Sequence, residues 1–312
     1  MGENLKTVVL GAGAWGSSLA FLLNHACSKC TIWSRRSDIS LTEAIKDADV
    51  IVSAISMKGV IPIIQQLKEI GIKEKAMIIT ATKGLDFDTI RTPSQIWQES
   101  FPDHTIVVLS GPNLSKEIDR SLPAATVVSS NVVEGAELAQ SMFASDIFRV
   151  YVNSDPIGTE LGGTLKNVMA IASGVCDGLK LGTNAKAALL TRALPEMIRI
   201  GTHLGASIET FFGLSGLGDL LATCDSPLSR NYQVGAGLAE GKSLDDILAH
   251  LEGTAEGVNT ANVVIKLASK EKIPAPIAYQ VYLLLKGKIT AQEAVENLMA
   301  RELKEEFWYL EF

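Results

Sequence analysis

The sequence predicts an α/β protein in which a doubly wound, mostly parallel sheet is followed by an all-α second domain. Up to Asn153, short β-branched runs alternate with amphipathic helical stretches, and beyond it almost no strand signal is left. Strand–helix alternation implies right-handed crossovers, and hence an open parallel sheet with helices on both faces. We therefore expect a first domain over residues 1–153 and a helical domain over residues 154–312.

Most of the expected strands are continuous apolar runs rather than alternating ones, which is typical of strands buried on both faces of a parallel sheet. They lie at 7–10, 30–34, 50–55, 77–81, 105–110, 125–129 and 148–153. The twelve residues between Arg36 and Asp49 leave room for one short helix, expected over 41–48. The second domain is expected to open with a helix, because Asp155 suits the N-cap and Pro156 the first helical position.

Composition excludes several classes of protein. Hydrophobic residues make up 47% of the 312 residues and charged residues 20%, which is typical of a globular chain with a large core. The formal net charge of -7 argues against a nucleic-acid partner, because such proteins usually carry a surplus of Lys and Arg. No apolar run approaches the roughly 18 residues that a membrane helix needs. With no signal-peptide pattern before the first strand, we expect a cytoplasmic protein without a membrane span.

The four cysteines are too few and too scattered for a disulfide framework. Cys27 and Cys30 form a lone CxxC, with neither a second CxxC nor a close pair of histidines. Structural zinc sites combine such a pair with a second pair of ligands. We therefore expect no metal site.

A glycine-rich turn directly follows the first expected strand and opens the first helix. Gly11, Gly13 and Gly16 form GxGxxG, with Ala14 and Trp15 between the last two. The first glycine makes the tight turn, the second lets backbone approach a pyrophosphate, and the third lets the helix pack on the strand. Unpaired N–H groups at the helix N-terminus favour the anion. The pattern predicts a dinucleotide site on a Rossmann sheet.

The end of the second strand bears on which dinucleotide binds. NAD-preferring sites usually carry Asp or Glu about 20 residues after the glycines, where it accepts the ribose 2′-OH. Arg35 and Arg36 stand here instead, and a guanidinium can pair with the 2′-phosphate of NADP(H). We expect NADP(H) to be preferred, with NAD(H) as a possible second cofactor. The alternative is that both arginines are solvated loop residues.

Later strand ends point to the same cleft, because ligands of doubly wound sheets bind outside the carboxyl ends of the strands. Lys83 stands in a tight turn that ends at Gly84, where its cation suits a phosphate or a carboxylate. Gly111 begins a rigid Gly-Pro turn whose backbone can approach a ligand closely, and Asn113 follows that turn.

The first helix of the second domain carries Lys166 beside two adjacent glycines, Gly162 and Gly163, on a shared helix face. Each glycine costs a helix about 1 kcal/mol relative to alanine, so the pair makes sense where something approaches the backbone beside the lysine. A lysine in a closed cleft can donate the proton that reduction of a ketone needs, if its pKa falls from about 10.4. Close helix packing on the glycines and a solvated lysine are the alternatives.

Further polar side chains occur in or beside two later turns, at Asp219 and at Ser229, Arg230 and Asn231. Arg230 offers a fork for a phosphate, and its two neighbours offer neutral hydrogen bonds. Asp219 can orient Lys166 or accept a substrate hydroxyl. The alternative for Asp219 is the N-cap of a helix that begins at Leu220.

These segments together resemble the bacterial NAD(P)-dependent glycerol-3-phosphate dehydrogenases, over nearly the whole chain. The resemblance implies reduction of dihydroxyacetone phosphate to sn-glycerol 3-phosphate, the backbone precursor of phospholipids. The matching pieces are GAGAWG (11–16), ATKG (81–84), SGPN (110–113), ELGGTLKNVMAIASG (160–174), NAKAALLTRAL (184–194), GLSGLGDLLATC (213–224), SRN (229–231) and TAEGV (254–258).

By the same resemblance, Lys166 is the expected general acid/base. The implied substrate contacts are Lys83, Gly111, Asp219, Ser229, Arg230 and Asn231. The implied cofactor contacts are Trp15, Arg35, Lys83, Ser115, Arg230, Thr254 and Glu256.

Two departures from the family pattern concern the site. The segment after Arg36 is shorter than in many relatives, which leaves open the wall that it contributes beside the cofactor. Asn113 stands where relatives commonly have Ser, and Ser115 where they have Ala. The substrate contact expected at Asn113 is therefore left open.

Two other functions fit parts of the pattern. A β-hydroxyacid or 6-phosphogluconate-type dehydrogenase also joins a Rossmann domain to helices, one of which carries a lysine. A protein that senses NADP(H) without turnover needs only the nucleotide site. The GLSGLGDL and SRN segments favour the glycerol-3-phosphate enzyme, and Lys166, Asp219 and Arg230 argue against a sensor. A homodimer is compatible with the sequence.

Overall fold

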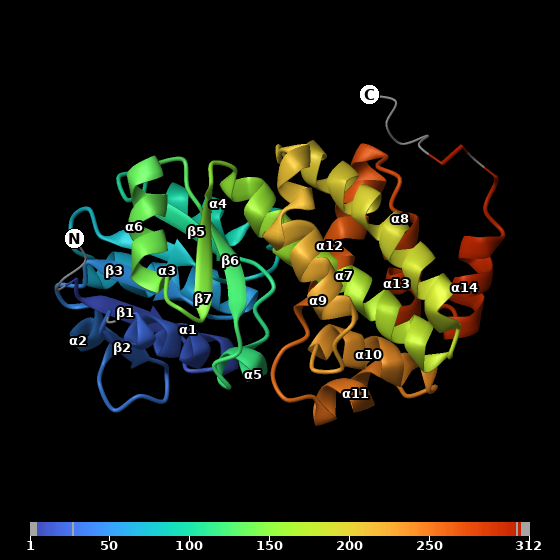
Figure 1. The fold of residues 1–312 in the computed structure, drawn as a ribbon, viewed down its shortest axis with the longest axis horizontal. Coiled ribbons are helices and arrows are strands. Elements are labelled where there is room, and N and C mark those ends of the chain that lie inside the picture. Colours follow the sequence, from blue (N-terminus) through green and yellow to red (C-terminus); the bar gives the residue numbers. More distant parts are fainter. Residues whose placement is uncertain (1–4, 27, 304, 307–312) are drawn as a thin grey trace.

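The computed structural model describes residues 5–26, 28–303 and 305–306. Two bodies lie side by side in Figure 1: a sheet flanked by helices, formed by the first half of the chain, and a bundle of helices formed by the second half. The predicted fold class, a doubly wound sheet followed by an all-α domain, is confirmed. The change from strands to helices falls between β7 (Phe148–Asn153) and α7 (Pro156–Gly178).

The sheet has seven strands in the order β2-β1-β3-β4-β5-β6-β7, and each neighbouring pair is parallel except β5–β6. Each expected strand forms, with ends shifted by at most two residues. The edge strands β2 and β7 carry exposed side chains, whereas β1, β3, β4 and β5 are buried throughout. The bounds of the other strands are Thr7–Leu10 (β1), Cys30–Trp33 (β2), Val50–Ser53 (β3), Met77–Thr80 (β4), Ile106–Ser110 (β5) and Ala124–Ser129 (β6).

Successive strand residues point to opposite faces of the sheet, and each face has its own apolar cluster. Val8 and Ile51 belong to one cluster, Val9 and Val52 to the other. Helices α2, α3 and α4 cover the first face, and α1 and α6 cover the second. The helices of this half are α1 (Ala14–His25), α2 (Leu41–Ile45), α3 (Met57–Ile70), α4 (Pro93–Ser100), α5 (Ser115–Ile118) and α6 (Val133–Phe143).

The short helix expected over 41–48 is α2, and its predicted end is wrong. It ends at Ile45, because Lys46 leaves the helical region at ψ 120° and Asp47 adopts a positive φ of 59°.

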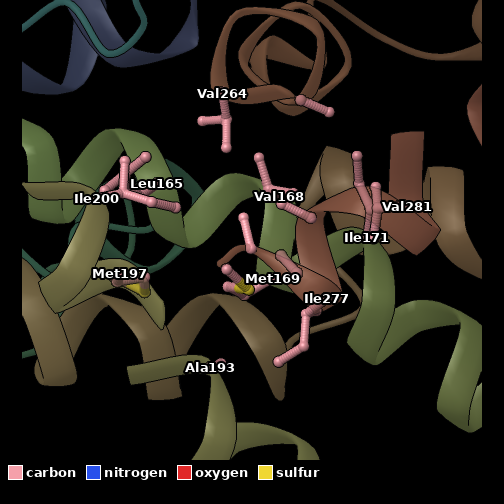
Figure 2. Close-up of a cluster of buried hydrophobic side chains, with 14 of the residues drawn as sticks. Leu165, Val168, Met169, Ile171, Ala193, Met197, Ile200, Val264, Ile277 and Val281 are labelled. Carbon is pink, nitrogen blue, oxygen red and sulfur yellow. The ribbon is translucent and has the colours of Figure 1, made fainter. Parts of the chain in front are cut away.

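The second body is organised around α7, a helix of 23 residues that is buried along most of its length. Figure 2 shows how Leu165 and Met169 of α7 pack against Met197 of α8 and Val264 of α12. The other helices of this half are α8 (Gly182–His203), a 3₁₀-helix (Ile208–Phe212), a π-helix (Leu214–Gly218), α9 (Asp219–Cys224), α10 (Arg230–Ala239), α11 (Leu244–His250), α12 (Glu256–Glu271), α13 (Pro276–Leu285) and α14 (Ala291–Met299).

Helix α10 crosses α7 at unusually close range. A Cβ at Gly174 of α7 would lie 2.0 Å from the carbonyl oxygen of Tyr232, and a Cβ at Gly235 of α10 would lie 1.9 Å from that of Ile171. Only glycine allows the two backbones to touch in this way. The contact fixes the start of α10, which carries Arg230, relative to the helix that carries Lys166.

The segment that follows β4 packs into the helical half. Leu85 lies in the apolar core of the helical domain, and Ile90 packs against that core. The Asn259 side chain of α12 donates to the carbonyl oxygen of Leu85 at 3.0 Å. The two halves therefore share packed residues on this side of the molecule.

A search of the described helices found none with the length and apolar character needed to cross a membrane.

The N-cap of α7 provides a test of how the helical domain is anchored. Asp155 accepts from the amide of Gly158 at 2.8 Å, as predicted, and its other oxygen accepts from the Ser207 amide and the Thr210 hydroxyl. Asp155→Ala should lower the free energy of unfolding by about 2–4 kcal/mol, since it removes a cap and two hydrogen bonds to a charged group. Urea unfolding measures the loss. Asp155→Asn keeps one accepting oxygen and should lose less; equal losses in the two variants would contradict this account.

Candidate active site

A cleft with a volume of about 820 Å³ opens between the two halves. Its walls come from the turn before α1, the segments after β4 and β5, α7, and the segments around the starts of α10 and α12. Of the residues predicted to form the site, the structure brings twelve to this cleft: Gly13, Ala14, Trp15, Lys83, Asn113, Ser115, Lys166, Ser229, Arg230, Asn231, Thr254 and Glu256.

The glycine-rich turn has the geometry of an anion cradle. Gly11 adopts φ +115°, which favours glycine, and a Cβ at Gly16 would lie 1.9 Å from the Gly11 carbonyl oxygen. A Cβ at Gly13, by contrast, would have no neighbouring atom within 4 Å, so the space beside this residue is open. No side chain caps α1, and its first turn carries no acidic residue. The free N–H groups and the helix dipole therefore suit the pyrophosphate of a dinucleotide.

Trp15 and the end of β2 frame this turn. The Trp15 indole donates to the Ala81 carbonyl at 3.1 Å, and the Gly11 amide donates to the Trp33 carbonyl at 2.7 Å. Arg35 and Arg36, two and three residues beyond Trp33, are exposed and are not among the residues that line the cleft. They follow β2, whose last residue, Trp33, pairs with Leu10 of β1 directly before the glycine-rich turn.

One carboxylate holds two lysines from different halves of the chain. Asp219 Oδ1 lies 2.9 Å from Lys166 Nζ, and Asp219 Oδ2 lies 2.5 Å from Lys83 Nζ. The Thr223 hydroxyl accepts from Lys166 and donates to Asp219 Oδ1. Asp219 is 2% exposed and lies behind the cleft wall, whereas Lys83 and Lys166 line the cleft.

Burial lowers the pKa of the Lys166 ammonium to about 8. The attraction of Asp219 opposes this change, and the repulsion of Lys83 adds to it. Burial alone would raise the pKa of Asp219, but the two ammonium groups outweigh it and hold that pKa below its ordinary range. Asp219 therefore stays ionised, while Lys166 can gain or lose a proton near neutral pH.

The two glycines of α7 admit different neighbours. A Cβ at Gly163 would lie 2.3 Å from the Ser110 hydroxyl and 3.3 Å from Lys83 Cε, so glycine makes room for the second lysine. A Cβ at Gly162 would lie 2.6 Å from the Ser215 carbonyl oxygen of the π-helix. Both predicted reasons for the pair, close packing and access beside Lys166, thus apply to it.

The start of α10 brings Arg230 and two neutral polar residues, Ser229 and Asn231, to the wall of the cleft. Ser229 caps α10 by accepting from the Tyr232 amide at 3.3 Å, which makes Arg230 its first residue. Asn231 donates to Asn167 Oδ1 and accepts from the Gly257 amide, both at 2.9 Å. These bonds tie α10 to α7 and α12 and leave Arg230 at the cleft.

Arg230 lies over the loop that precedes α12. A Cβ at Gly253, where φ is +93°, would stand 2.5 Å from Arg230 Nη1. Burial raises the pKa of Glu256, and the nearby Arg230 opposes that rise. The cleft is thus lined by a guanidinium and by a buried ammonium with a lowered pKa, which together suit a small substrate with a carbonyl and an anionic tail.

Comparisons with known proteins agree with this chemistry. The chain matches the NAD-dependent glycerol-3-phosphate dehydrogenase N-terminus over residues 6–41 and 37–136, and the corresponding C-terminus over residues 155–296. The chain belongs to this family. The resemblance inferred from the sequence motifs is therefore confirmed.

Individual relatives of this dehydrogenase family align over nearly the whole chain. A protein of Synechocystis sp. named glycerol-3-phosphate dehydrogenase (NAD(P)+) is 63% identical, over 97% of this chain and 95% of its own. One of the same name from Acaryochloris marina is 62% identical, over 96% of each chain. The crystal structure of glycerol-3-phosphate dehydrogenase from Coxiella burnetii superposes with a TM-score of 0.91 at 33% identity, over 96% of this chain and 100% of its own.

Some predicted residues of the dehydrogenase lie behind the cleft rather than in its wall. Within the glycine-rich turn, Gly11 packs against the Ala54 backbone and Gly16 packs against Gly11. Gly111 packs against Thr126 and offers its carbonyl oxygen to Lys83 Nζ at 3.4 Å. The alternative that Asp219 is an N-cap is wrong, because Gly218 takes that position and Asp219 is already the first residue of α9.

Asn113 lines the cleft, but its amide is engaged with the sheet. It donates to the Ala125 carbonyl at 3.3 Å and accepts from the Thr126 hydroxyl at 2.9 Å. Since both ends of the amide already have partners, Asn113 shapes the wall beside Ser115 at the start of α5.

Among the polar residues of the cleft that sequence reasoning missed, two hold predicted site residues of the dehydrogenase in place. Thr223 connects Lys166 to Asp219, and Asn167 holds Asn231. Thr223 stands four residues after Asp219, so their shared helix face was a usable signal. Asn167 directly follows Lys166, but its bond with Asn231 depends on the packing of α10 on α7.

The predicted CxxC is only partly described. Cys27 lies outside the described residues, and Cys30 is a free thiol. Among the residues that the structure describes, no group of three or more His, Cys, Asp and Glu is arranged to hold a metal ion.

Proposed function

We propose that this chain reduces dihydroxyacetone phosphate to sn-glycerol 3-phosphate with a nicotinamide dinucleotide, in a reversible reaction that supplies the backbone of phospholipids. The observation that carries the proposal is the buried Lys166, whose pKa is lowered to about 8 in a cleft that begins at the GxGxxG turn. Family membership and the names of the relatives support the same substrate and cofactor.

Lys166 is the proposed general acid. When bound, the cofactor supplies the hydride for the C2 carbonyl carbon. Lys166 protonates the carbonyl oxygen as negative charge develops there, and in the reverse direction the neutral amine accepts the proton from the hydroxyl. Asp219 and Thr223 hold the lysine nitrogen in place throughout. Lys83 adds positive charge beside the developing alkoxide.

The phosphate of the substrate is the proposed partner of Arg230, with Ser229 and Asn231 beside it. A guanidinium can pair with two phosphate oxygens at once, which fixes orientation as well as position. Binding energy from this remote group then aligns the carbonyl with Lys166. Gly111, Asn113 and Asp219 shape the same pocket and complete the proposed substrate site.

The proposed cofactor site runs from the glycine turn along the first half of the chain. Gly11, Gly13, Ala14 and Gly16 hold the pyrophosphate, and the remaining contacts are Trp15, Arg35, Arg36, Lys83, Ser115, Arg230, Thr254 and Glu256. We infer that NADP(H) is preferred over NAD(H), because two guanidiniums and no carboxylate follow the second strand.

We also propose that the two halves act as a dinucleotide-binding domain over 1–153 and a substrate domain over 154–312. The enzyme is expected in the cytoplasm, where its substrate and nicotinamide cofactors occur, and as a homodimer. Gel filtration with light scattering distinguishes a dimer from a monomer.

The first test is substrate-dependent oxidation of the reduced cofactor. The wild type should consume NADPH only when dihydroxyacetone phosphate is added, and Lys166→Ala should lower kcat by roughly 10²–10⁴-fold, the usual contribution of a general acid. Absorbance of the reduced nicotinamide measures both. Lys186, which is partly buried, lies outside the cleft lining and pairs with Asp177 and Asp225, is the control lysine. Turnover of hydroxy acids alone, or near-normal kcat in Lys166→Ala, would refute the assignment.

The lowered pKa of Lys166 predicts opposite pH dependence for the two directions. Reduction needs the ammonium, so its kcat/KM should fall as pH rises through about 8. Oxidation of sn-glycerol 3-phosphate needs the neutral amine, so its kcat/KM should rise over the same interval. Initial rates between pH 7 and 10, with a buffer series of constant ionic strength, test the sign. Parallel profiles in both directions would exclude Lys166 as the titrating group.

The cofactor preference is tested at Arg35. Arg35→Asp should weaken NADPH binding by about tenfold or more, because a carboxylate repels the 2′-phosphate, and should change NADH binding little. Fluorescence titration of the two reduced cofactors gives both dissociation constants. Arg149→Asp, which changes an exposed arginine on the opposite edge strand β7, is the charge-matched control. An equal loss for both cofactors would rule out pairing with the 2′-phosphate.

A further inference from the structure

One face of α7 is directed at the segment that follows β4. Glu160, Gly163, Thr164 and Asn167 recur at spacings of three and four residues, so they share that face. At Gly163, the helix makes room for Lys83. On the same face, Glu160 and Thr164 form hydrogen bonds to residues on either side of the loop that carries Leu85 and Ile90.

These bonds hold both ends of segment 84–94. Thr164 Oγ1 accepts from the Gly84 amide at 3.0 Å, and Gly84 is the residue after Lys83. Ten residues on, the Glu160 carboxylate accepts from the Ser94 amide at 3.0 Å and from the Ser94 hydroxyl at 2.5 Å. The segment is therefore fixed to the catalytic helix at its start and at its end.

Helix α4 satisfies only part of its N-terminus by itself, and Glu160 accepts from the Ser94 amide that remains. It already has a capping box, in which Thr92 accepts from the Gln95 amide and Gln95 returns a bond to the Thr92 amide. Glu160 is 2% exposed, and a buried carboxylate is costly unless its oxygens are bonded. Its position is explained by the connection that it makes between the two halves of the chain.

We propose that Glu160 is a positioning residue for the reaction: through Ser94 it holds segment 84–94 against α7 and thereby sets Lys83 at the Lys166–Asp219 pair. Thr164 acts with it at the other end of the segment. This inference rests on the proposed function, because it assigns Lys83 and Lys166 to the reacting site. Glu160 itself touches neither substrate nor cofactor.

The chain offers a matched control in Glu196 of α8. That side chain is 1% exposed and accepts from the Ile277 and Ala278 amides at the start of α13, at 2.9 and 2.8 Å. Burial raises the pKa of each glutamate to about 7. Glu196 thus has the same chemistry and burial as Glu160, but both of its partners lie within the helical domain.

The test compares Glu160→Ala with Glu196→Ala at equal concentrations of folded protein. Both should lower the melting temperature, but only Glu160→Ala should lower kcat, by about tenfold to a hundredfold, as expected for a misplaced catalytic group. Glu160→Gln keeps an acceptor for the Ser94 amide and should recover part of the loss. If Glu160→Ala does not fold, Ser94→Ala removes only the hydroxyl and should lower kcat in the same direction.

The pH dependence of reductive kcat/KM distinguishes a positioning role of Glu160 from a merely structural one, because a loss of stability alone would not shift it. The charged and titratable groups that face Lys166 are Asp219, Lys83 and Cys224. When Lys83 moves away, Lys166 loses a cation that lowers its pKa, and Asp219 is left to pair with it alone. The pH at which reductive kcat/KM falls should therefore rise in Glu160→Ala and stay at the wild-type value in Glu196→Ala.

Hydrogen exchange separates this proposal from the proposed function. In Glu160→Ala, amides of segment 84–94 should exchange faster than in Glu196→Ala, a result that needs no substrate. If the wild type does not turn over dihydroxyacetone phosphate but the two variants still differ in exchange, the proposed function is refuted. The link between segment 84–94 and α7 then still stands. An active wild type, with kcat, pH profile and exchange alike in both variants, would overturn the positioning role of Glu160.

Discussion

The arrangement of the site depends on one buried carboxylate that holds two ammonium groups. Asp219 contacts Lys83 from the segment after β4 and Lys166 from α7, so a single side chain joins the two halves of the chain at the point of chemistry. The buried Lys166 would cost several kcal/mol without a counter-charge, and the partly buried Lys83 beside it would add repulsion. With Asp219 present, one positive charge remains uncompensated. That remaining charge favours an anionic substrate, and burial, followed by the repulsion of Lys83, keeps the pKa of Lys166 lowered.

The segment after β4, α7 and α9 meet at Asp219, and their backbones must approach one another closely there. Glycines lie at these close contacts. Gly163 admits Lys83, Gly162 admits the π-helix before α9, and Gly174 and Gly235 bring α10 against α7. Each glycine weakens its helix by about 1 kcal/mol, and tertiary packing offsets that loss. The π-helix (Leu214–Gly218) belongs to the same arrangement, since such irregular turns are frequent at functional sites.

Sequence predicted the fold well where the signal was local. Buried parallel strands form unbroken apolar runs, and Asp155 with Pro156 marks the start of α7 from adjacent residues alone. The site was predictable where chemistry is carried by residue type in a motif, as for Lys166 and Arg230. Bonds such as Glu160 to Ser94, or Asn231 to Asn167, join residues more than sixty positions apart, and no spacing rule encodes them. The end of α2 was missed because the positive φ of Asp47 depends on the turn into β3.

The acidic net charge of the chain and a phosphorylated substrate are compatible because the charges are unevenly placed. Lys83, Lys116, Lys166 and Arg230 line the cleft, against the carboxylates of Glu252 and Glu256. Fields near a binding site are set by such local groups within about a Debye length, roughly 8–10 Å in physiological salt. The other acidic residues are not among those that line the cleft. The formal net charge of -7 therefore does not describe the cleft. The charged residues that line the cleft decide which ligand it attracts.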